Sequence, residues 1–222
     1  MRIITGIYKG RRFDIPHSFK ARPTTDFAKE NIFNVLNAYI DLEGTRALDL
    51  FAGTGSISLE LLSRGCEQVV SVEADRDHSR FIGECVRKLG VTNHQLIRGD
   101  VFRYLKSAQK SLNLEHSGEA ALNGRRPLNR DAVALNAAQQ QLNLERGSAA
   151  FEQPRAFDFI FADPPYSLPN LPDIPQLVLQ SGLLAPGGVF VFEHGKQNDF
   201  SSHPCFREHR AYGSVNFSIF TT

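Results

Sequence analysis

The sequence lacks any long hydrophobic segment. Among its 222 residues, the longest apolar stretches are short pieces such as Val69-Val70 and Phe159-Ile160-Phe161-Ala162. A membrane-spanning helix needs about 20 consecutive apolar residues, and a secretory signal needs an apolar region that is absent from the first residues. We therefore expect no contact with a membrane and a location in the cytoplasm.

Cysteine is scarce as well. Cys66, Cys85 and Cys205 are odd in number, lie far apart and form no C-x-x-C pair. Neither a disulfide framework nor a zinc site is indicated by this pattern. We expect reduced thiols and no bound metal.

The chain as a whole also has no large excess of positive or negative charge, because its net charge is only +1. The hydrophobic content of 41% and the charged content of 22% are typical of one globular domain spanning residues 1–222. The cations are nevertheless concentrated at one end. Residues 1–25 contain one acid, Asp14, and six cations, Arg2, Lys9, Arg11, Arg12, Lys20 and Arg22. This pattern predicts a short basic N-terminal arm.

Hydrophobic periodicity predicts alternating helices and strands after this arm. Apolar residues at helical spacing indicate an amphipathic helix from Thr24-Thr25-Asp26 to about Ile40. Three strand-then-helix units follow, with predicted strands at 47–51, 69–73 and 95–97 and predicted helices at 56–63, 78–89 and 101–106. Strands that alternate with helices predict a parallel sheet covered on both faces.

The second half of the chain extends this α/β pattern and then changes. We predict a strand at 157–162, a helix near 175–181 and a strand at 189–193. Residues 206–212 and 215–219 flank Gly213-Ser214 and predict two strands joined by a tight turn. The expected sheet is therefore mostly parallel, with an antiparallel C-terminal edge.

Residues 107–155 interrupt the pattern. They are rich in Leu, Asn, Ala, Gln and Arg, and Leu112-Asn113-Leu114-Glu115 recurs as Leu142-Asn143-Leu144-Glu145. A helix at 131–146 that ends at Gly147 fits this composition. We interpret the segment as an insertion between elements of the core and assign it no function.

A glycine loop follows the first predicted strand. In Asp49-Leu50-Phe51-Ala52-Gly53-Thr54-Gly55 the two glycines allow a ligand to approach the backbone without meeting a Cβ. Ser58 replaces the third glycine of the dinucleotide fingerprint, so the loop need not hold a pyrophosphate. Two glycines alone are equally typical of a plain turn, and only the surrounding residues favour a nucleoside-bearing ligand.

Three acids accompany this loop. Glu73 ends the second strand, where an acid accepts hydrogen bonds from ribose hydroxyls of either NAD or S-adenosylmethionine. Asp100 follows the third strand and can accept from an adenine amino group, cap a helix, or do both. Asp49 lies within an apolar strand and can face the ammonium group of a cofactor.

Asp163-Pro164-Pro165-Tyr166 is the most informative tetrapeptide. Two consecutive prolines fix the backbone before any substrate arrives. Asp163 can accept one N–H of an exocyclic base amine, the carbonyl of Pro164 can accept the other, and Tyr166 can stack on the base. A proline-rich turn without function is the alternative.

Taken together, these motifs resemble a known family. Arg22-Pro23-Thr24-Thr25-Asp26, the glycine loop, the D-P-P-Y loop and Glu193-His194 are similar to those of the bacterial 16S ribosomal RNA guanine-N2 methyltransferases of the RsmD type. The similarity extends over the chain except residues 107–155. His194 is not assigned to catalysis, because a lone histidine is more often structural.

The resemblance implies a Rossmann-like class I methyltransferase fold that uses S-adenosyl-L-methionine. It implies transfer to N2 of guanine 966 in 16S ribosomal RNA, by a monomer that acts on a 30S particle or an assembly intermediate. The catalytic residues expected from it are Asp163, Pro164, Pro165 and Tyr166. The expected cofactor contacts are Asp49, Phe51, Ala52, Gly53, Thr54, Gly55, Glu73, Ala74, Asp100 and Val101. The expected substrate contacts are Arg2, Lys9, Arg11, Arg12, Arg22 and Thr24.

Other functions compete with this interpretation. An adenine-N6 methyltransferase acting on DNA or RNA uses the same amine chemistry, but the DNA enzymes usually add a recognition domain for which this chain has little room. A non-catalytic RNA-binding module would not need an acid and an aromatic residue in the Asp163 loop. An NAD-dependent oxidoreductase is disfavoured by Ser58.

Overall fold

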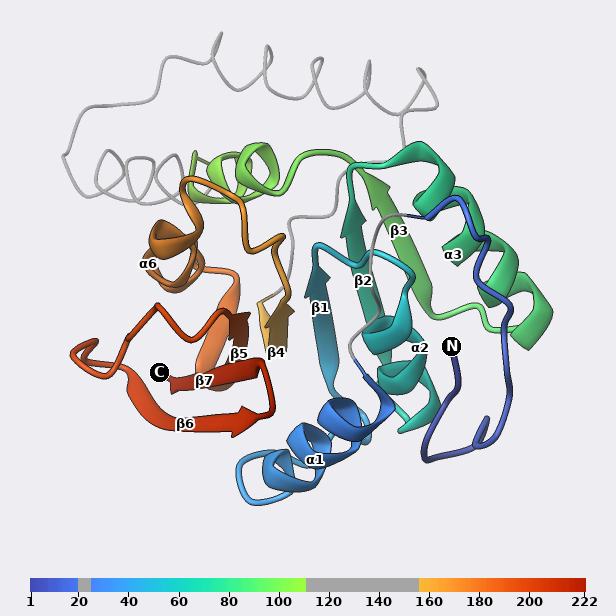
Figure 1. The fold of residues 1–222 in the computed structure, drawn as a ribbon, viewed down its shortest axis with the longest axis horizontal. Coiled ribbons are helices and arrows are strands. Elements are labelled where there is room, and N and C mark those ends of the chain that lie inside the picture. The colour runs from blue at the N-terminus through green and yellow to red at the C-terminus, as the bar shows by residue number, and fades with distance from the viewer. Residues whose placement is uncertain (20–24, 111–155) are drawn as a thin grey trace, which may run out of the picture.

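The computed structural model describes residues 1–19, 25–110 and 156–222. Most of the predicted insertion, including its repeat and its possible helix, lies outside these ranges, as do Arg22 and Thr24. The described strands form one seven-stranded sheet in the order β3-β2-β1-β4-β5-β7-β6 (Figure 1). Their bounds are β1 Arg46–Leu50, β2 Gln68–Glu73, β3 His94–Arg98, β4 Phe157–Ala162, β5 Leu184–His194, β6 Phe206–Tyr212 and β7 Val215–Thr221.

The first five strands are parallel, and β7 pairs antiparallel with both β5 and β6. This arrangement confirms the expected mostly parallel sheet with an antiparallel C-terminal edge. Residues 101–110 are also helical. No described helix is long and apolar enough to cross a membrane. The bounds of the other helices are α1 Asp26–Leu36, α2 Ser56–Ser63, α3 Arg76–Leu89, the 3₁₀ turn η1 Leu171–Asp173 and α6 Ile174–Gln180.

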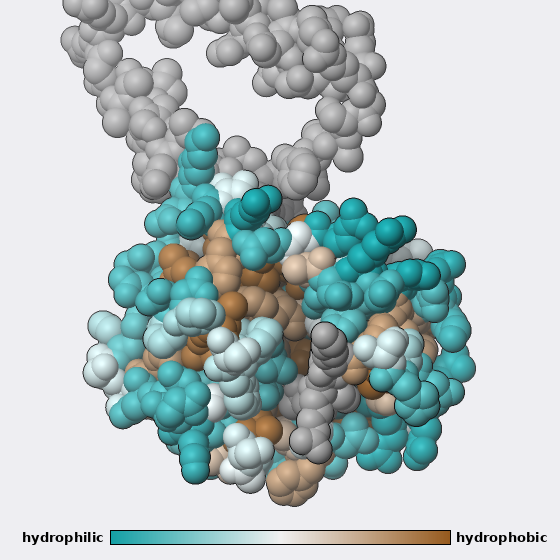
Figure 2. Space-filling model, turned by 45° about the horizontal axis from the view of Figure 1, so that its top comes forward, coloured by the Kyte–Doolittle hydropathy of each residue, from teal (hydrophilic) through white to brown (hydrophobic). Residues whose placement is uncertain are grey.

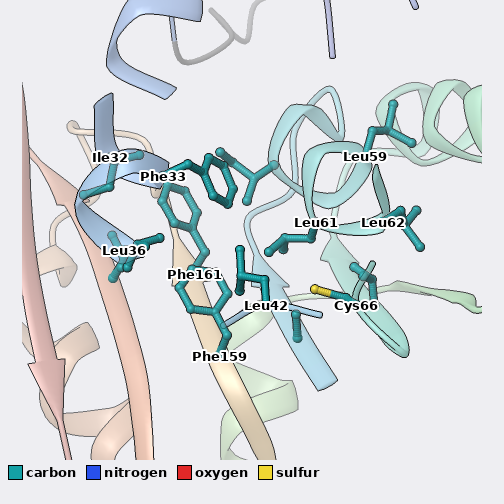
Figure 3. Packing of buried hydrophobic residues seen from close by; sticks show 14 of the residues in the cluster. Ile32, Phe33, Leu36, Leu42, Leu59, Leu61, Leu62, Cys66, Phe159 and Phe161 are labelled. Atoms are coloured by element: carbon teal, nitrogen blue, oxygen red, sulfur yellow. The ribbon is translucent and has the colours of Figure 1, made fainter. Parts of the chain in front are cut away.

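Both faces of the sheet are covered, because successive strand residues point to opposite sides. In β1, Ala47 belongs to the apolar cluster under α1, α2 and α3, whereas Leu48 belongs to the cluster under α6 and residues 101–110. Figure 3 shows part of the first cluster, in which side chains of α1 and α2 meet Phe159 and Phe161 of β4. The central strands are therefore buried on both sides, as their continuous apolar sequences require.

Several helix boundaries differ from the predictions, and the helix predicted at 101–106 extends to residue 110. The helix α1 ends at Leu36 rather than near Ile40, because the following residues turn back and the Tyr39 hydroxyl donates to Glu208 Oε2 at 2.7 Å. The helix α3 begins at Arg76, two residues before the predicted start. The Asp75 side chain accepts the backbone N–H groups of the two residues that follow Arg76 and so caps the helix.

Strand boundaries differ as well, most of them by only one or two residues. The fifth strand was predicted at 189–193, but β5 starts at Leu184. The pairing of β5 with β4 shifts register between Phe157 and Phe159. A bulge of this kind absorbs Pro186-Gly187-Gly188 within the strand. The strand β1 ends at Leu50, because Phe51 has a positive φ of 63° and leaves the extended conformation.

The first 13 residues of the basic arm fold back on themselves and dock on α2. Ile3 and Phe13 are buried, and backbone hydrogen bonds join Ile3 to Arg11 at 3.0 Å and Phe13 to Met1 at 3.0 Å. The turn of this hairpin packs so tightly that a Cβ at Gly6 would lie 1.8 Å from the Ser63 carbonyl oxygen. The described start of the arm is therefore part of the folded structure.

A buried ion pair between Lys29 and Glu60 holds the arm in place. Both side chains are fully buried, and Lys29 Nζ lies 3.5 Å from Glu60 Oε2. The ammonium also donates to the Arg2 carbonyl at 2.7 Å, and the carboxylate accepts the N–H groups of Ile4 at 2.8 Å and Thr5 at 3.0 Å. Burial lowers the pKa of Lys29, and the Glu60 charge opposes that shift.

Replacing Lys29 by Met is expected to destabilise the protein by roughly 2–4 kcal/mol, because the buried Glu60 would lose one cation and keep its salt bridge to Arg64, and the Arg2 carbonyl would lose its donor. Urea unfolding followed by circular dichroism measures this loss. Glu30→Gln, on the exposed side of the same helix, is the matched control and should change stability by less than about 0.5 kcal/mol. A loss below about 1 kcal/mol for Lys29→Met would contradict a structural role for the pair.

Candidate active site

The predicted cofactor and catalytic motifs meet at one edge of the sheet. The parallel strands β3, β2, β1 and β4 are neighbours, so the loops at their carboxyl ends lie side by side. Open α/β sheets bind ligands at this edge. In Figure 2, apolar surface lies in the middle of the view, with hydrophilic surface on both sides.

The glycine loop turns sharply between β1 and α2. Gly53 and Gly55 have positive φ values of 56° and 74°, a conformation that side chains other than glycine rarely adopt. A Cβ at Gly55 would come within 2.9 Å of Ile82 Cγ1, so this glycine also lets α2 pack closely on α3. Phe51 shares the positive φ without being glycine, which places backbone strain at the start of the loop.

Asp49 lies beneath this loop and is only 2% exposed. Its carboxylate accepts the Ser58 N–H at 3.0 Å and also the Ser58 hydroxyl. Burial raises the pKa of Asp49 to about 7, although the hydrogen bonds from Ser58 oppose the shift. A cation brought close to this group would favour its charged form.

Glu73 is positioned by the two loops on either side of it. Its Oε2 accepts the Gly53 N–H at 2.6 Å, and its Oε1 accepts the Asp75 N–H at 2.8 Å. Each carboxylate oxygen can accept a further hydrogen bond. The carboxylate at the end of β2 is therefore directed at the glycine loop.

The loop after β3 completes this half of the site. Asp100 Oδ1 accepts the Arg103 N–H at 2.9 Å, so the predicted helix-capping role is confirmed. Ala74 is exposed and Val101 is buried. Phe102 follows Val101, and its ring lies 6.3 Å from that of Phe51, edge to face. An aromatic pair thus spans the loops after β1 and β3.

The D-P-P-Y loop follows β4, next to the glycine loop. The Asp163 N–H lies 3.4 Å from the Leu50 carbonyl oxygen. Pro164 is buried, whereas Pro165 and Tyr166 are exposed. The structure thus brings the predicted catalytic residues beside the predicted cofactor loop.

Tyr166 is held by a residue to which the sequence analysis gave no role. Its hydroxyl donates to Glu193 Oε1 at 2.9 Å, and Glu193, near the end of β5, is only 5% exposed. Burial raises the pKa of Tyr166, and the neighbouring charges of Glu193 and Asp163 raise it further, so the phenol stays protonated and remains a donor. The Glu193-His194 motif was noticed, but its partner lies 27 residues away and no local pattern reveals the contact.

His194 lies in the interior of the protein, and both of its ring nitrogens have hydrogen-bond partners. It is fully buried, with Nε2 2.9 Å from Ser218 Oγ and Nδ1 3.0 Å from the Gly195 carbonyl oxygen. Burial lowers the pKa of His194. Within residues 1–19, 25–110 and 156–222, no cluster of three or more His, Cys, Asp or Glu side chains is suited to a metal ion.

The predicted substrate cations lie in two places. Lys9, Arg11 and Arg12 are exposed on the hairpin that docks at Ser63, the last residue of α2. The turn of the hairpin lies at the end of α2 away from the glycine loop, whereas Arg12 pairs with Arg2, whose carbonyl and the Ser56 hydroxyl at the start of α2 both accept from Lys29. Arg2 is partly exposed and pairs with Asp26 at 3.2 Å. Arg22 and Thr24 fall outside the described residues.

The sheet order and the two loops define the class of Rossmann-like methyltransferases. One solved structure with this fold is "Putative methyltransferase yhhF from Escherichia coli", with a TM-score of 0.69 and 21% identity over 100% of this chain and 97% of that one. At this identity the likeness shows the fold alone.

Sequence comparison shows the family. The family model "Conserved hypothetical protein 95" matches residues 1–116 and 107–221. "Putative rRNA methyltransferase YlbH" of Bacillus subtilis is 31% identical over 198 residues, which are 89% of this chain and 84% of that protein. "Ribosomal RNA small subunit methyltransferase D" of Escherichia coli K12 is 36% identical over 110 residues, or 50% and 54% of the two chains. The chain belongs to this family of RsmD-type methyltransferases.

The raised pKa of Asp49 predicts how stability depends on pH. The folded protein binds this proton more tightly than the unfolded chain, whose aspartate pKa is about 3.9. Stability from this group is therefore present below about pH 4 and lost as the pH rises to about 7. Asp49→Asn should gain stability relative to the natural protein between about pH 4 and pH 8.

Urea unfolding at about pH 4 and about pH 8 measures this difference in stability. Asp173→Asn, at an exposed aspartate, is the control and should show no such gain. An Asp49→Asn variant whose stability relative to the natural protein is the same at both pH values would show that Asp49 does not carry the shift.

Proposed function

We propose that this protein transfers a methyl group from S-adenosyl-L-methionine to the exocyclic N2 of a guanine in 16S ribosomal RNA. The observation that carries the proposal is the placement of the D-P-P-Y loop, with Tyr166 fixed by Glu193, directly beside the glycine loop. Guanine 966 is the base expected from the family resemblance. A monomer acting in the cytoplasm on a 30S particle or an assembly intermediate is the proposed physiological form.

The residues at the β1 and β2 ends fit the cofactor. The glycine loop offers backbone without Cβ atoms, the Glu73 carboxylate suits ribose hydroxyls, and the Asp49 carboxylate suits an ammonium group. Asp100 and the neighbouring Ala74 and Val101 would border the adenine. When bound, S-adenosylmethionine supplies a methyl group already activated by its sulfonium.

The protein's own contribution is to orient a poor nucleophile. The lone pair of an exocyclic base amine is delocalised into the ring, so the amine must be held in the geometry that frees it. In the proposed complex, Asp163 accepts one N–H of this amine and the Pro164 carbonyl accepts the other. Asp163 acts first as a hydrogen-bond acceptor, and the amine proton leaves to it or to water.

Tyr166 provides the surface on which the base stacks. A base taken out of an RNA helix loses stacking that costs a few kcal/mol, and an aromatic ring partly offsets this cost. Because the Tyr166 hydroxyl is bound to buried Glu193, the ring is positioned before the base arrives. Glu193 is therefore a positioning residue that acts through Tyr166.

Methyl transfer to 30S particles that lack this modification tests the function. With labelled S-adenosylmethionine and nucleoside analysis, we expect N2-methylguanosine. Recovery of N6-methyladenosine would move the protein to the adenine class, and absence of transfer would favour a non-catalytic RNA-binding module.

Asp163→Ala should lower turnover by at least about a hundredfold while leaving cofactor affinity unchanged, because its proposed contact is with the base and not with the cofactor. Single-turnover methyl transfer and calorimetric cofactor titration measure the two properties. Asp173→Asn, at an exposed aspartate outside the site, serves as the control. Full activity of Asp163→Ala would overturn the catalytic assignment.

Glu193→Leu should lower methyl transfer by roughly tenfold to a hundredfold, because an unsupported ring is less well oriented. Tyr166→Phe keeps the ring but removes the hydroxyl that Glu193 binds. If Glu193 acts through this hydroxyl, the double variant should lose no more activity than Glu193→Leu alone. Glu193→Gln, which retains an acceptor oxygen, should recover most of the activity. Additive losses would contradict a positioning role.

A further inference from the structure

A basic groove lies beside the proposed cofactor site. It is lined by Arg76, Ser79 and Arg80 of α3 and by Leu96 and Arg98 of β3. The strand β3 forms the edge of the sheet, so the groove opens at the side of the molecule. In Figure 2 hydrophilic surface covers the right side of the view, the side on which Figure 1 places α3.

The groove carries positive charge that the described part of the chain does not neutralise. All three guanidinium groups belong to exposed residues. Arg80 pairs with Asp77 at 2.7 Å, but within the described ranges neither Arg76 nor Arg98 forms an ion pair. Glu73 is the register partner of Arg98, yet its carboxylate is directed to the N–H groups of Gly53 and Asp75.

The walls of the groove are set by the fold. Arg98 stands on a strand that pairs along its whole length with β2. On the opposite wall, the Ser79 hydroxyl donates to the Asp75 carbonyl at 2.7 Å within the first turn of α3. The guanidinium groups therefore extend from two backbones in fixed positions, and planar guanidinium groups match the geometry of phosphate oxygens.

The proposed cofactor does not account for this charge, because S-adenosylmethionine contains no phosphate. The position of the groove instead suits a long polyanion. The described end of the arm reaches α3, where the Phe19 ring lies 4.4 Å from that of His78 and 5.5 Å from that of Phe81. The arm and the groove thus contact the same helix.

We propose that this groove binds the phosphate backbone of the RNA substrate, and that Arg76 and Arg98 contact phosphates at a second site separate from the arm. The inference rests on the proposed function for the identity of the RNA. The groove would hold RNA flanking the target base, next to the β2 and β3 ends of the active site.

The salt dependence of RNA binding tests the groove. We would measure the affinity of the full chain for a 16S ribosomal RNA transcript between about 50 and 200 mM salt. Each phosphate contact on single-stranded RNA contributes about 0.7 to the slope of log affinity against log salt. The double variant Arg76→Ala, Arg98→Ala should bind roughly tenfold more weakly at low salt, with a slope smaller by about 1.4.

A matched control lies on the same helix. Arg87→Ala, Lys88→Ala removes two exposed cations from the last turn of α3, outside the groove, and should leave the slope within about 0.3 of the natural protein's value. Cofactor affinity should be equal in all three proteins. An unchanged slope in the groove variant, or an equal loss in the control, would overturn the proposal.

Failure of the groove and failure of the proposed function give different results. A natural protein that methylates 30S particles while the groove variant keeps its slope would refute only the groove. A natural protein that binds RNA with the expected slopes but transfers no methyl would refute the enzymatic function and leave the groove standing. Absence of RNA binding by the natural protein would refute both.

Discussion

The arm, α1 and α2 depend on the buried Lys29–Glu60 ion pair. An ion pair removed from water returns little net stability unless its remaining hydrogen-bonding groups are also satisfied. Here the ammonium binds the Arg2 carbonyl and the Ser56 hydroxyl, and the carboxylate binds two backbone N–H groups of the arm. Ser56 follows the glycine loop directly, so the pair joins the basic arm to the backbone beside the proposed cofactor site.

At both ends of the candidate site, as in the Lys29–Glu60 pair, a carboxylate is held in place by its hydrogen-bond partners. Glu73 is fixed by two backbone N–H groups and Glu193 by its position in β5 and its bond to Tyr166. Neither carboxylate has to be reoriented when a ligand enters. Fixed polar groups of this kind lower the cost of reaching a reactive geometry, because the reorganisation is completed during folding.

Much of the fold could be predicted because hydrophobic periodicity is local. The bounds of α2 and β4 agree with the prediction, and both glycine and proline loops lie at the ends of the predicted strands. The start of β5 was missed because Pro186-Gly187-Gly188 is typical of a turn, and only pairing with β4 makes it part of a strand.

The buried charged residues that support the arm and the site could not be predicted from hydrophobic periodicity. In the sequence, Glu60 lies among leucines, and a helical pattern would place such an acid on the exposed face of the helix. In the structure, every residue of α2 is buried. Lys29 and Glu193 raise the same difficulty, since each is buried by a partner far away in the sequence. The motifs of a site can thus be found from the sequence, whereas the residues that orient them depend on tertiary contacts.

The docking of the arm on α2 also constrains the order of folding during synthesis. The Ile4 N–H and its acceptor Glu60 are separated by 56 positions, so the arm cannot dock on α2 until that helix has emerged from the ribosome. Contacts between distant residues form late, because closing a long loop costs entropy before any contact compensates for it. The arm is therefore synthesised before α2 but reaches its native position only after that helix is available.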